Sequence, residues 1–167
     1  GNDAFTATTA GNYTITGGAG NDTADFGATL TNADSFDGGD GTDTLFLNNT
    51  SATTINAYSI TATNTLNDKI SNVEKVDFGS TLAQNVDLGR LDGISDVVID
   101  NLAADVTLSG IAATNNFLIK ATTGQALTLT LADATGSSDV VNINLKAAAL
   151  INANTITAAG VETVNIL

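Results

Sequence analysis

Short apolar runs recur at near-regular intervals through the second half of the chain. In residues 127–131 and 141–145, Leu, Val or Ile alternates with Thr or Asn. Such alternation is typical of a strand with one buried face and one wet face. Starts about ten residues apart are compatible with either a β-sandwich or a β-solenoid. The pattern predicts strands over residues 76–78, 86–88, 97–99, 106–108, 117–119, 127–131, 140–145 and 161–167.

The first 48 residues have a different pattern, in which glycine-rich loops precede short apolar runs. Residues 38–46 read Gly-Gly-Asp-Gly-Thr-Asp-Thr-Leu-Phe and match the repeat G-G-x-G-x-D-x-U-x at every specified position. Residues 17–25 form a second copy with Ala24 in the apolar position, and residues 1–5 read as the end of a third. Candidate return strands are residues 13–16 and 35–37, with Tyr13, Ile15 and Phe36 facing the interior.

The spacing of the loops predicts that they stack. Asp3, Asp22 and Asp43 follow one another at intervals of 19 and 21 residues, close to two nonapeptides. Glycine permits sharp turns whose carbonyl oxygens point inward, and each Asp adds a carboxylate. Calcium takes 6 to 8 oxygen ligands, more than one loop supplies, so each ion is expected between neighbouring loops. Ordinary surface turns do not require this residue set three times in register.

The distribution of charge supports a cation as partner. The chain carries a formal charge of −13 from 18 acidic and 5 basic residues, and its first 68 residues contain no Lys or Arg. Phosphate binding needs clustered Lys and Arg, which argues against nucleic acid. Seven aspartates crowd into the first 43 residues, namely Asp3, Asp22, Asp25, Asp34, Asp37, Asp40 and Asp43. A compact segment of this kind repels itself unless a positive ion joins it.

Several classes of chemistry are disfavoured by the composition. Without His or Cys, disulfides, thiolate metal sites and most pairs of base and nucleophile are excluded. Glu74 and Glu162 are the only glutamates, and we interpret them as a structural bend or calcium ligands rather than as a glycosidase pair. We therefore expect no enzymatic activity. No apolar run approaches the roughly 18 residues of a transmembrane helix, and no signal peptide is visible.

The glycine loops resemble the RTX, or hemolysin-type, calcium-binding repeats of bacterial proteins exported by type I secretion. The rest of the chain resembles the surface-layer (S-layer) proteins of Gram-negative bacteria, in which such turns alternate with β-solenoid segments rich in Thr, Ala and Asn. The phrase Gly-Val-Glu-Thr-Val-Asn-Ile at residues 160–166, its diverged copy at 72–78 and the stretch 129–145 carry this second resemblance.

The resemblance implies a calcium ligand set. Carbonyl oxygens of Gly17, Ala19 and Gly20 with the Asp22 carboxylate face carbonyls of Gly38, Asp40 and Gly41 with the Asp43 carboxylate, and Asp3 supplies the carboxylate one turn earlier. The Asp40 side chain is expected to face solvent. Asp133 and Asp139 are weaker candidates, because residues 133–139 offer oxygens at alternate positions but lack the late bidentate Glu of an EF-hand. An Asp/Gly turn is the favoured interpretation there.

These observations predict an all-β fold, a parallel β-roll or β-solenoid. The expected divisions are a calcium roll over 1–48, a connection over 49–72 and a solenoid segment over 73–167. Strand character is expected around 57–61, a short helix or a bend at 66–73 and a helical turn at 146–151.

The expected function is that of an internal fragment of a secreted S-layer protein. Calcium drives its folding and its self-assembly on the cell surface. The expected partners are calcium ions and other copies of the protein, with cell-surface polysaccharide as a further candidate. Alternatives are an RTX adhesin or biofilm-matrix module, or the accessory roll of a secreted RTX enzyme.

Overall fold

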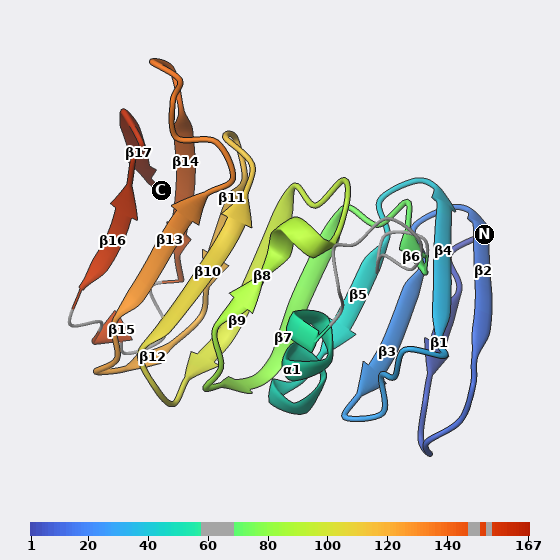
Figure 1. Cartoon of the computed structure of the whole chain (residues 1–167). Coiled ribbons are helices and arrows are strands. Elements are labelled where there is room, and N and C mark those ends of the chain that lie inside the picture. Colours follow the sequence, from blue (N-terminus) through green and yellow to red (C-terminus); the bar gives the residue numbers. More distant parts are fainter. Residues whose placement is uncertain (58–68, 147–150, 153–154) are drawn as a thin grey trace.

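The protein is built mainly from parallel β-sheets. The computed structural model describes residues 1–57, 69–146, 151–152 and 155–167. Strands make up 49% of the structure and helices 8%. The largest sheet runs from the N-terminal to the C-terminal end of the molecule (Figure 1). Its eight strands, in spatial order, are β1 (Ala4–Thr6), β3 (Thr23–Gly27), β5 (Thr44–Leu47), β7 (Lys75–Leu82), β9 (Asp96–Leu102), β11 (Asn116–Ile119), β14 (Val140–Leu145) and β17 (Thr163–Ile166).

Three smaller sheets hold the strands that lie between these in the sequence. The first contains β2 (Thr14–Ala19), β4 (Ser35–Asp40) and β6 (Ile70–Ser71). The second contains β8 (Val86–Asp87), β10 (Val106–Ile111), β13 (Leu127–Leu131) and β16 (Ile156–Ala159). The third pairs β12 (Thr122–Thr123) with β15 (Ile151–Asn152). The chain thus returns repeatedly to the largest sheet, and this parallel arrangement is consistent with a β-solenoid or β-roll.

Apolar side chains of equivalent strand positions line up as columns inside the molecule. One column follows the pairings of β5, β7, β9, β11 and β14, and its members are Leu45, Val76, Val97, Phe117 and Ile143. Each of these side chains is almost completely buried. Phe36 is buried as predicted, whereas Tyr13 and Ile15 pack against the core only partly buried. The predicted strands therefore bury the faces expected from their alternation.

Most predicted strands of the second half are present. The predictions for 127–131 and 140–145 agree with β13 and β14 at both ends, and those for 76–78, 97–99, 106–108 and 117–119 lie within longer strands or match them. Two strands were predicted to be longer than they are. The strand expected at 86–88 stops at Asp87, where a 3-10 turn (Leu88–Arg90) begins, and the strand expected at 161–167 covers only Thr163–Ile166.

A helix that the sequence did not predict, α1 (Asn49–Ala57), begins the connection after β5. The Asn48 side chain accepts hydrogen bonds from the backbone N–H of Thr50 and Ser51, which satisfies donors of the first turn. Ala52 and Ile55 are buried against the core. Ala57, expected in a strand, ends the helix, and the rest of that expected strand lies outside the described residues.

The alternatives of a helix or a bend at 66–73 and of a helical turn at 146–151 are also corrected in part. Ile70 and Ser71 form strand β6, because β4 offers them a parallel partner through Phe36 and Asp37. Residues 66–68 lie outside the described part of the chain. In the second segment, 147–150 lie outside it as well, and Ile151 belongs to strand β15.

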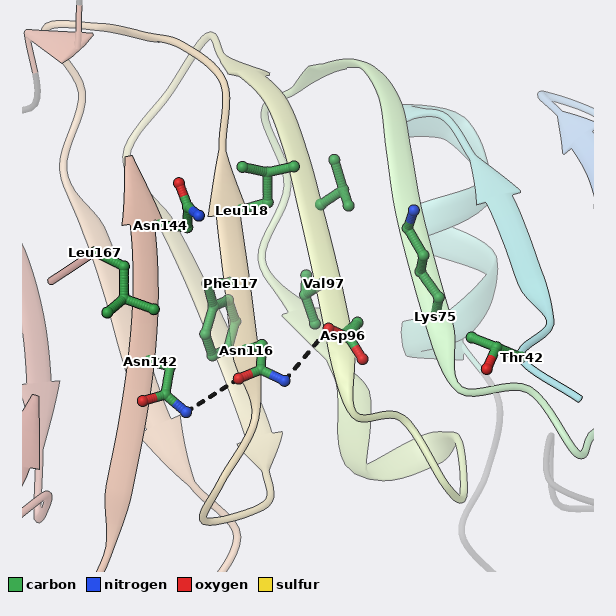
Figure 2. Close-up of a pocket in the computed structure, with 11 residues that line it drawn as sticks. Thr42, Lys75, Asp96, Val97, Asn116, Phe117, Leu118, Asn142, Asn144 and Leu167 are labelled. Atoms are coloured by element: carbon green, nitrogen blue, oxygen red, sulfur yellow. Dashed lines mark hydrogen bonds between the residues drawn. The ribbon is translucent and has the colours of Figure 1, made fainter. Parts of the chain in front are cut away.

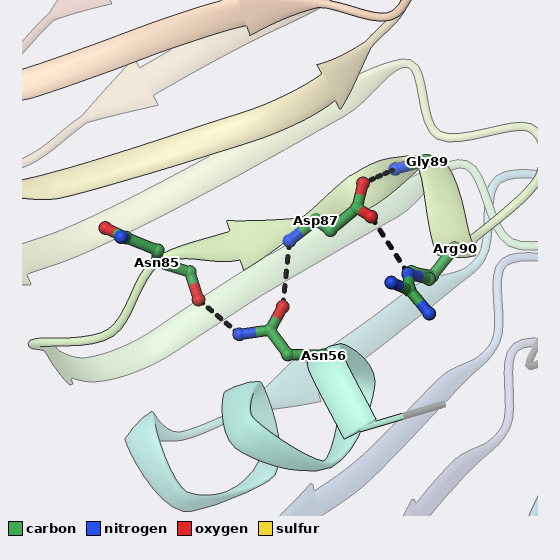
Figure 3. Close-up of polar contacts among 5 residues, drawn as sticks. All are labelled: Asn56, Asn85, Asp87, Gly89 and Arg90. Atoms are coloured by element: carbon green, nitrogen blue, oxygen red, sulfur yellow. Dashed lines mark hydrogen bonds and ion pairs between the residues drawn. The ribbon is translucent and has the colours of Figure 1, made fainter. Parts of the chain in front are cut away.

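Helix α1 covers the free edge of strand β8 (Figure 3). The Asn56 side chain accepts a hydrogen bond from the backbone N–H of Asp87 and donates one to the carbonyl oxygen of Asn85. These bonds occupy backbone groups that an edge strand otherwise exposes to pairing with other chains. The helix therefore lies where the sheet of β2, β4 and β6 gives way to that of β8.

The expected division into three segments remains a prediction, but the largest sheet continues across it. Strand β5 pairs directly with β7 through Thr44 and Lys75, although 31 residues separate equivalent positions there. The sheet therefore joins the glycine loops to the later strands. Among the described residues no helix has the length and apolar character needed to cross a membrane.

Candidate calcium loops

The two complete glycine loops lie one above the other. Strands β2 and β4 pair in register through Gly18 with Gly39 and Ala19 with Asp40, so loop 17–22 stacks on loop 38–43. A Cβ placed on Gly39 would collide with the carbonyl oxygen of Gly18, and one on Gly41 with that of Gly20. Gly39 and Gly41 also have φ values of 99° and 146°, which side chains disfavour. The stacking predicted from the spacing of the aspartates is present.

The carboxylates of successive turns form a ladder along one edge of the stack. The backbone N–H of Asp3 donates to Asp22 Oδ1 at 2.7 Å, and that of Asp22 donates to Asp43 Oδ1 at 2.6 Å. The next step departs from the repeat, because the N–H of Asp43 donates to Glu74 Oε2 at 2.8 Å. Each carboxylate thus accepts a hydrogen bond from a backbone N–H of the preceding turn.

These hydrogen bonds leave one oxygen of each buried aspartate without a partner. Asp22 is 2% exposed and Asp43 is fully buried, yet Asp22 Oδ2 and Asp43 Oδ2 have no hydrogen bond. Burying an ionised carboxylate is costly unless a donor or a cation compensates it. No Lys or Arg occurs in the first 68 residues to act as that cation.

Asp34 shows that burial in the acidic segment does not by itself leave an aspartate without partners. It is 1% exposed and belongs to the same acidic segment. Its carboxylate accepts hydrogen bonds from the backbone N–H of Tyr13 and from both the N–H and the hydroxyl of Thr31. Asp34 therefore stabilises a turn, whereas Asp22 and Asp43 each present an unpaired buried oxygen.

The unpaired oxygens lie close to carbonyl oxygens of the following turn. A Cβ on Gly17 would be within 3.0 Å of both Asp22 Oδ2 and the carbonyl oxygen of Gly38. The corresponding atom on Gly38 would be within 3.0 Å of both Asp43 Oδ2 and the carbonyl oxygen of Asn72. The glycines are thus required where a carboxylate from one turn and a carbonyl from the next converge.

Two of the other expected carbonyl ligands already accept hydrogen bonds. The carbonyl oxygen of Ala19 accepts from the amino group of Gly1 at 2.6 Å, and that of Asp40 accepts from the N–H of Gly20 at 2.8 Å. The Asp40 side chain is exposed as expected, and Asp3 is exposed at the N-terminal edge.

These donors fit a hard cation. Carboxylate and carbonyl oxygens are the ligands that calcium prefers, and nitrogen or sulfur ligands typical of zinc are absent from the loops. Within the described residues no three side chains of His, Cys, Asp or Glu converge on one point. Calcium binding here would therefore depend on backbone carbonyl oxygens as much as on Asp22 and Asp43.

The weaker candidates, Asp133 and Asp139, lie in one turn, in which Asp133 is exposed and Asp139 is partly buried. Asp133 Oδ1 accepts from both the N–H and the hydroxyl of Thr135, and these bonds lower the pKa of Asp133. The N–H of Asp139 donates to Glu162 Oε2 at 3.0 Å, while Asp139 Oδ2 has no partner. The contacts of Asp133 are those of a local Asp turn, the interpretation that the sequence favours.

A further buried carboxylate, Asp77, which the sequence pattern did not single out, has a cation of its own. Asp77 is 5% exposed, and its Oδ2 lies 3.9 Å from Lys120 Nζ, which also contacts Asp100 Oδ1. Burial raises the pKa of Asp77, although Lys120 opposes the shift. The hydrogen bond to Asp100 raises the pKa of Lys120. Because 43 residues separate Asp77 from Lys120, only the alignment of β7, β9 and β11 reveals the pair.

The outer face of the largest sheet also carries a row of amide side chains (Figure 2). Asn165 donates to Asn142, Asn142 to Asn116, and Asn116 to Asp96. A shallow groove lies along this row and is floored in part by Val98 and Leu118. The amides bond to one another across strands, which indicates a ladder that stabilises the sheet.

No family model, curated protein or solved structure matches the chain. The contacts of the loops themselves are therefore the basis for inferring its function.

Proposed function

We propose that this chain is a structural, calcium-binding segment of a secreted bacterial S-layer protein, folded as an RTX roll that continues into a β-solenoid. The observation that carries the calcium part is the pair of buried oxygens without partners, Asp22 Oδ2 and Asp43 Oδ2. Both lie in a segment that lacks any basic side chain. The resemblance of the loops to RTX repeats, and of the later strands to S-layer segments, supports the remainder.

In the proposed mechanism the stacked loops form a calcium site that exists only in the folded protein. The carbonyl of Gly38 and the carboxylates of Asp22 and Asp43 are brought together only when β2 and β4 pair. Bound calcium supplies the positive charge that the buried carboxylates lack. A ligand that binds only the folded state, at 100 times its dissociation constant, stabilises it by about 2.7 kcal/mol per independent site. The glycine loops would thus stay loose where calcium is scarce and fold after export to the cell surface.

Titration of the chain with calcium tests whether the chain binds this ion and folds with it. We expect isothermal titration calorimetry to detect binding, and circular dichroism to show β-structure that increases with calcium and decreases when a chelator is added. Magnesium at the same concentration should have less effect, because it demands a smaller and stricter octahedral site. A chain that shows no binding heat and an unchanged spectrum would refute the calcium proposal.

Two variants of one loop localise the binding. Asp43→Asn removes the charge of a fully buried carboxylate, whereas Asp40→Asn removes the same charge from an exposed side chain in the same loop. We expect Asp43→Asn to weaken calcium binding by about tenfold or more, since ligand charge is a main determinant of calcium affinity. Asp40→Asn should bind nearly as the parent chain does. Equal losses in both variants would mean that only the overall charge of the segment matters.

The assembly part of the proposal has its own test. Electron microscopy of the chain, with calcium and with chelator, should show ordered two-dimensional arrays only with calcium. Chains that bind calcium but remain dispersed at all concentrations would contradict lattice formation. Binding of such dispersed chains to a defined glycan would instead favour the adhesin alternative.

A further inference from the structure

We propose that the turn Asn72-Val73-Glu74 completes a second calcium site, in which the Asn72 carbonyl and the Glu74 carboxylate take the parts that Gly38 and Asp43 take in the first. The inference rests on the proposed calcium function and extends it to residues outside the nonapeptide repeats. In this arrangement the first site lies between the two glycine loops. The second lies between loop 38–43 and the turn.

The register of the strands places the turn directly against loop 38–43. Asp37 pairs with Ser71 on one side of the turn, and Thr44 pairs with Lys75 on the other. The next residues along the chain, Gly38 and Asn72, are therefore neighbours, as are Asp43 and Glu74. Three residues thus span the distance that six residues span in the loop below.

The contacts on the two sides of loop 38–43 are equivalent. Towards loop 17–22, Asp43 Oδ1 accepts the N–H of Asp22, and the Gly38 carbonyl lies over Gly17 beside Asp22 Oδ2. Towards the turn, Glu74 Oε2 accepts the N–H of Asp43, and the Asn72 carbonyl lies over Gly38 beside Asp43 Oδ2. Asp43 Oδ2 is buried and has no hydrogen-bond partner, so it needs a cation at this second position.

The turn is held in the conformation that this role requires. Asn72 has a φ of 51°, a left-handed conformation that Asn adopts more readily than most residues. Its side-chain amide donates to Asp37 Oδ1 at 2.7 Å, and the neighbouring Val73 is 1% exposed. The carbonyl oxygen of Glu74 accepts from the N–H groups of Ser95 and Asp96. Contacts on both sides thus fix the direction of the Asn72 carbonyl.

The ladder of carboxylates ends at Glu74. Lys75 pairs with Asp96, so the residue opposite Glu74 on the next strand is Ser95. The Ser95 hydroxyl donates to Asp96 Oδ2 and offers no charge to the stack. The calcium stack would therefore close at Glu74, one turn beyond the last nonapeptide.

The chain supplies a matched control for testing this inference. Asp105 Oδ1 accepts the N–H of Ala126 just as Glu74 Oε2 accepts that of Asp43, but Asp105 is exposed and lies in the turn between β9 and β10, outside the glycine loops. Glu74→Gln and Asp105→Asn both keep an oxygen that accepts the hydrogen bond and both remove one charge. We expect calorimetry of Glu74→Gln to show one tight calcium ion fewer, or about tenfold weaker binding at one site. Asp105→Asn should bind as the parent chain does.

The outcomes separate this inference from the proposed function. If the parent chain binds calcium and Glu74→Gln matches it in number and affinity, the second site is refuted while the calcium function stands. If the parent chain binds no calcium, both fail. Should Glu74→Gln not fold, NMR of the parent chain decides the question. Amide signals of residues 72–74 should shift on calcium titration while that of Asp105 stays, and unchanged signals at 72–74 would overturn the proposal.

Discussion

The glycine loops and the strands after Lys69 both contain buried aspartates. The negative charge of these aspartates is compensated differently in the two regions. In the loops, Asp22 and Asp43 each keep an oxygen without a partner, and no basic residue precedes Lys69. In the later strands, Asp77 lies 3.9 Å from the ammonium group of Lys120. One region contains its own cation, whereas the other has no basic side chain in its sequence.

Under the proposed calcium function, the contrast predicts that the continuous sheet depends on calcium at one end only. An internal ammonium group is present under all conditions, so the later strands should keep their stability without added ions. An ion from solution contributes only in proportion to its concentration and affinity. Calcium would thus control the folding of the N-terminal turns, and the column of Leu45, Val76 and Val97 joins the core of these turns to that of the later strands.

The largest expected effect comes from the core of the later strands. Phe117 is 1% exposed and lies in the apolar column of the largest sheet. We expect Phe117→Ala to lower the free energy of unfolding by about 3 to 5 kcal/mol, because it leaves a cavity among packed side chains. Urea unfolding with calcium and with chelator should give similar losses. A loss confined to calcium-loaded protein would break the distinction between the two regions.

A somewhat smaller loss of stability is expected when alanine replaces a glycine that lies close to backbone atoms of a neighbouring turn. At Gly38 a Cβ meets the backbone carbonyl of Asn72, whereas at Gly79 it meets the movable ring of Phe46 at 3.3 Å. We expect Gly38→Ala to cost about 2 to 3 kcal/mol in the presence of calcium and to weaken calcium binding. Gly79→Ala should cost under about 1 kcal/mol and leave binding intact. Equal thermal shifts in the two variants would show that the loops are not tightly stacked.

The internal cation should matter less, because it is partly exposed. The side chain of Lys120 is 34% exposed, and that of Asp77 is 7% exposed. We expect Lys120→Gln to cost about 1 kcal/mol whether or not calcium is present, since solvent screens part of the ion pair. Lys146→Gln, at an exposed lysine, serves as the control and should be nearly neutral. Thermal unfolding measures both, and rescue of Lys120→Gln by calcium would mean that an ion can replace the ammonium group.

The smallest effect is a pH dependence at Asp77. Burial raises the pKa of Asp77 above 3.8 in the folded state, so the ionised form opposes folding at neutral pH. Asp77→Asn removes that penalty and should raise stability at pH 7 by roughly 1 kcal/mol or less. The difference between variant and parent should shrink as the pH falls through the raised pKa and vanish below about 3.8, where Asp77 is protonated in both states. A difference independent of pH would assign the effect to packing.

Local patterns in the sequence predicted much of the fold. Alternation at 127–131 and 140–145 predicted two strands with their exact ends, and the intervals between Asp3, Asp22 and Asp43 predicted stacked loops. Helix α1 was missed because its Thr- and Asn-rich sequence has weak helical character. Its buried Ile55 and the cap from Asn48 stabilise it only in the folded protein.

By itself, the sequence determined the strand periodicity, the glycine loops and the absence of Lys and Arg from the acidic first 68 residues. These are local properties, since each depends on residues near one another in the chain. Only the tertiary structure decided that Glu74 follows Asp43 in the carboxylate ladder and that Lys120 meets Asp77. Both relations depend on which strands pair and in what register, and turns of unequal length, here 19 to 31 residues, conceal that register from the sequence.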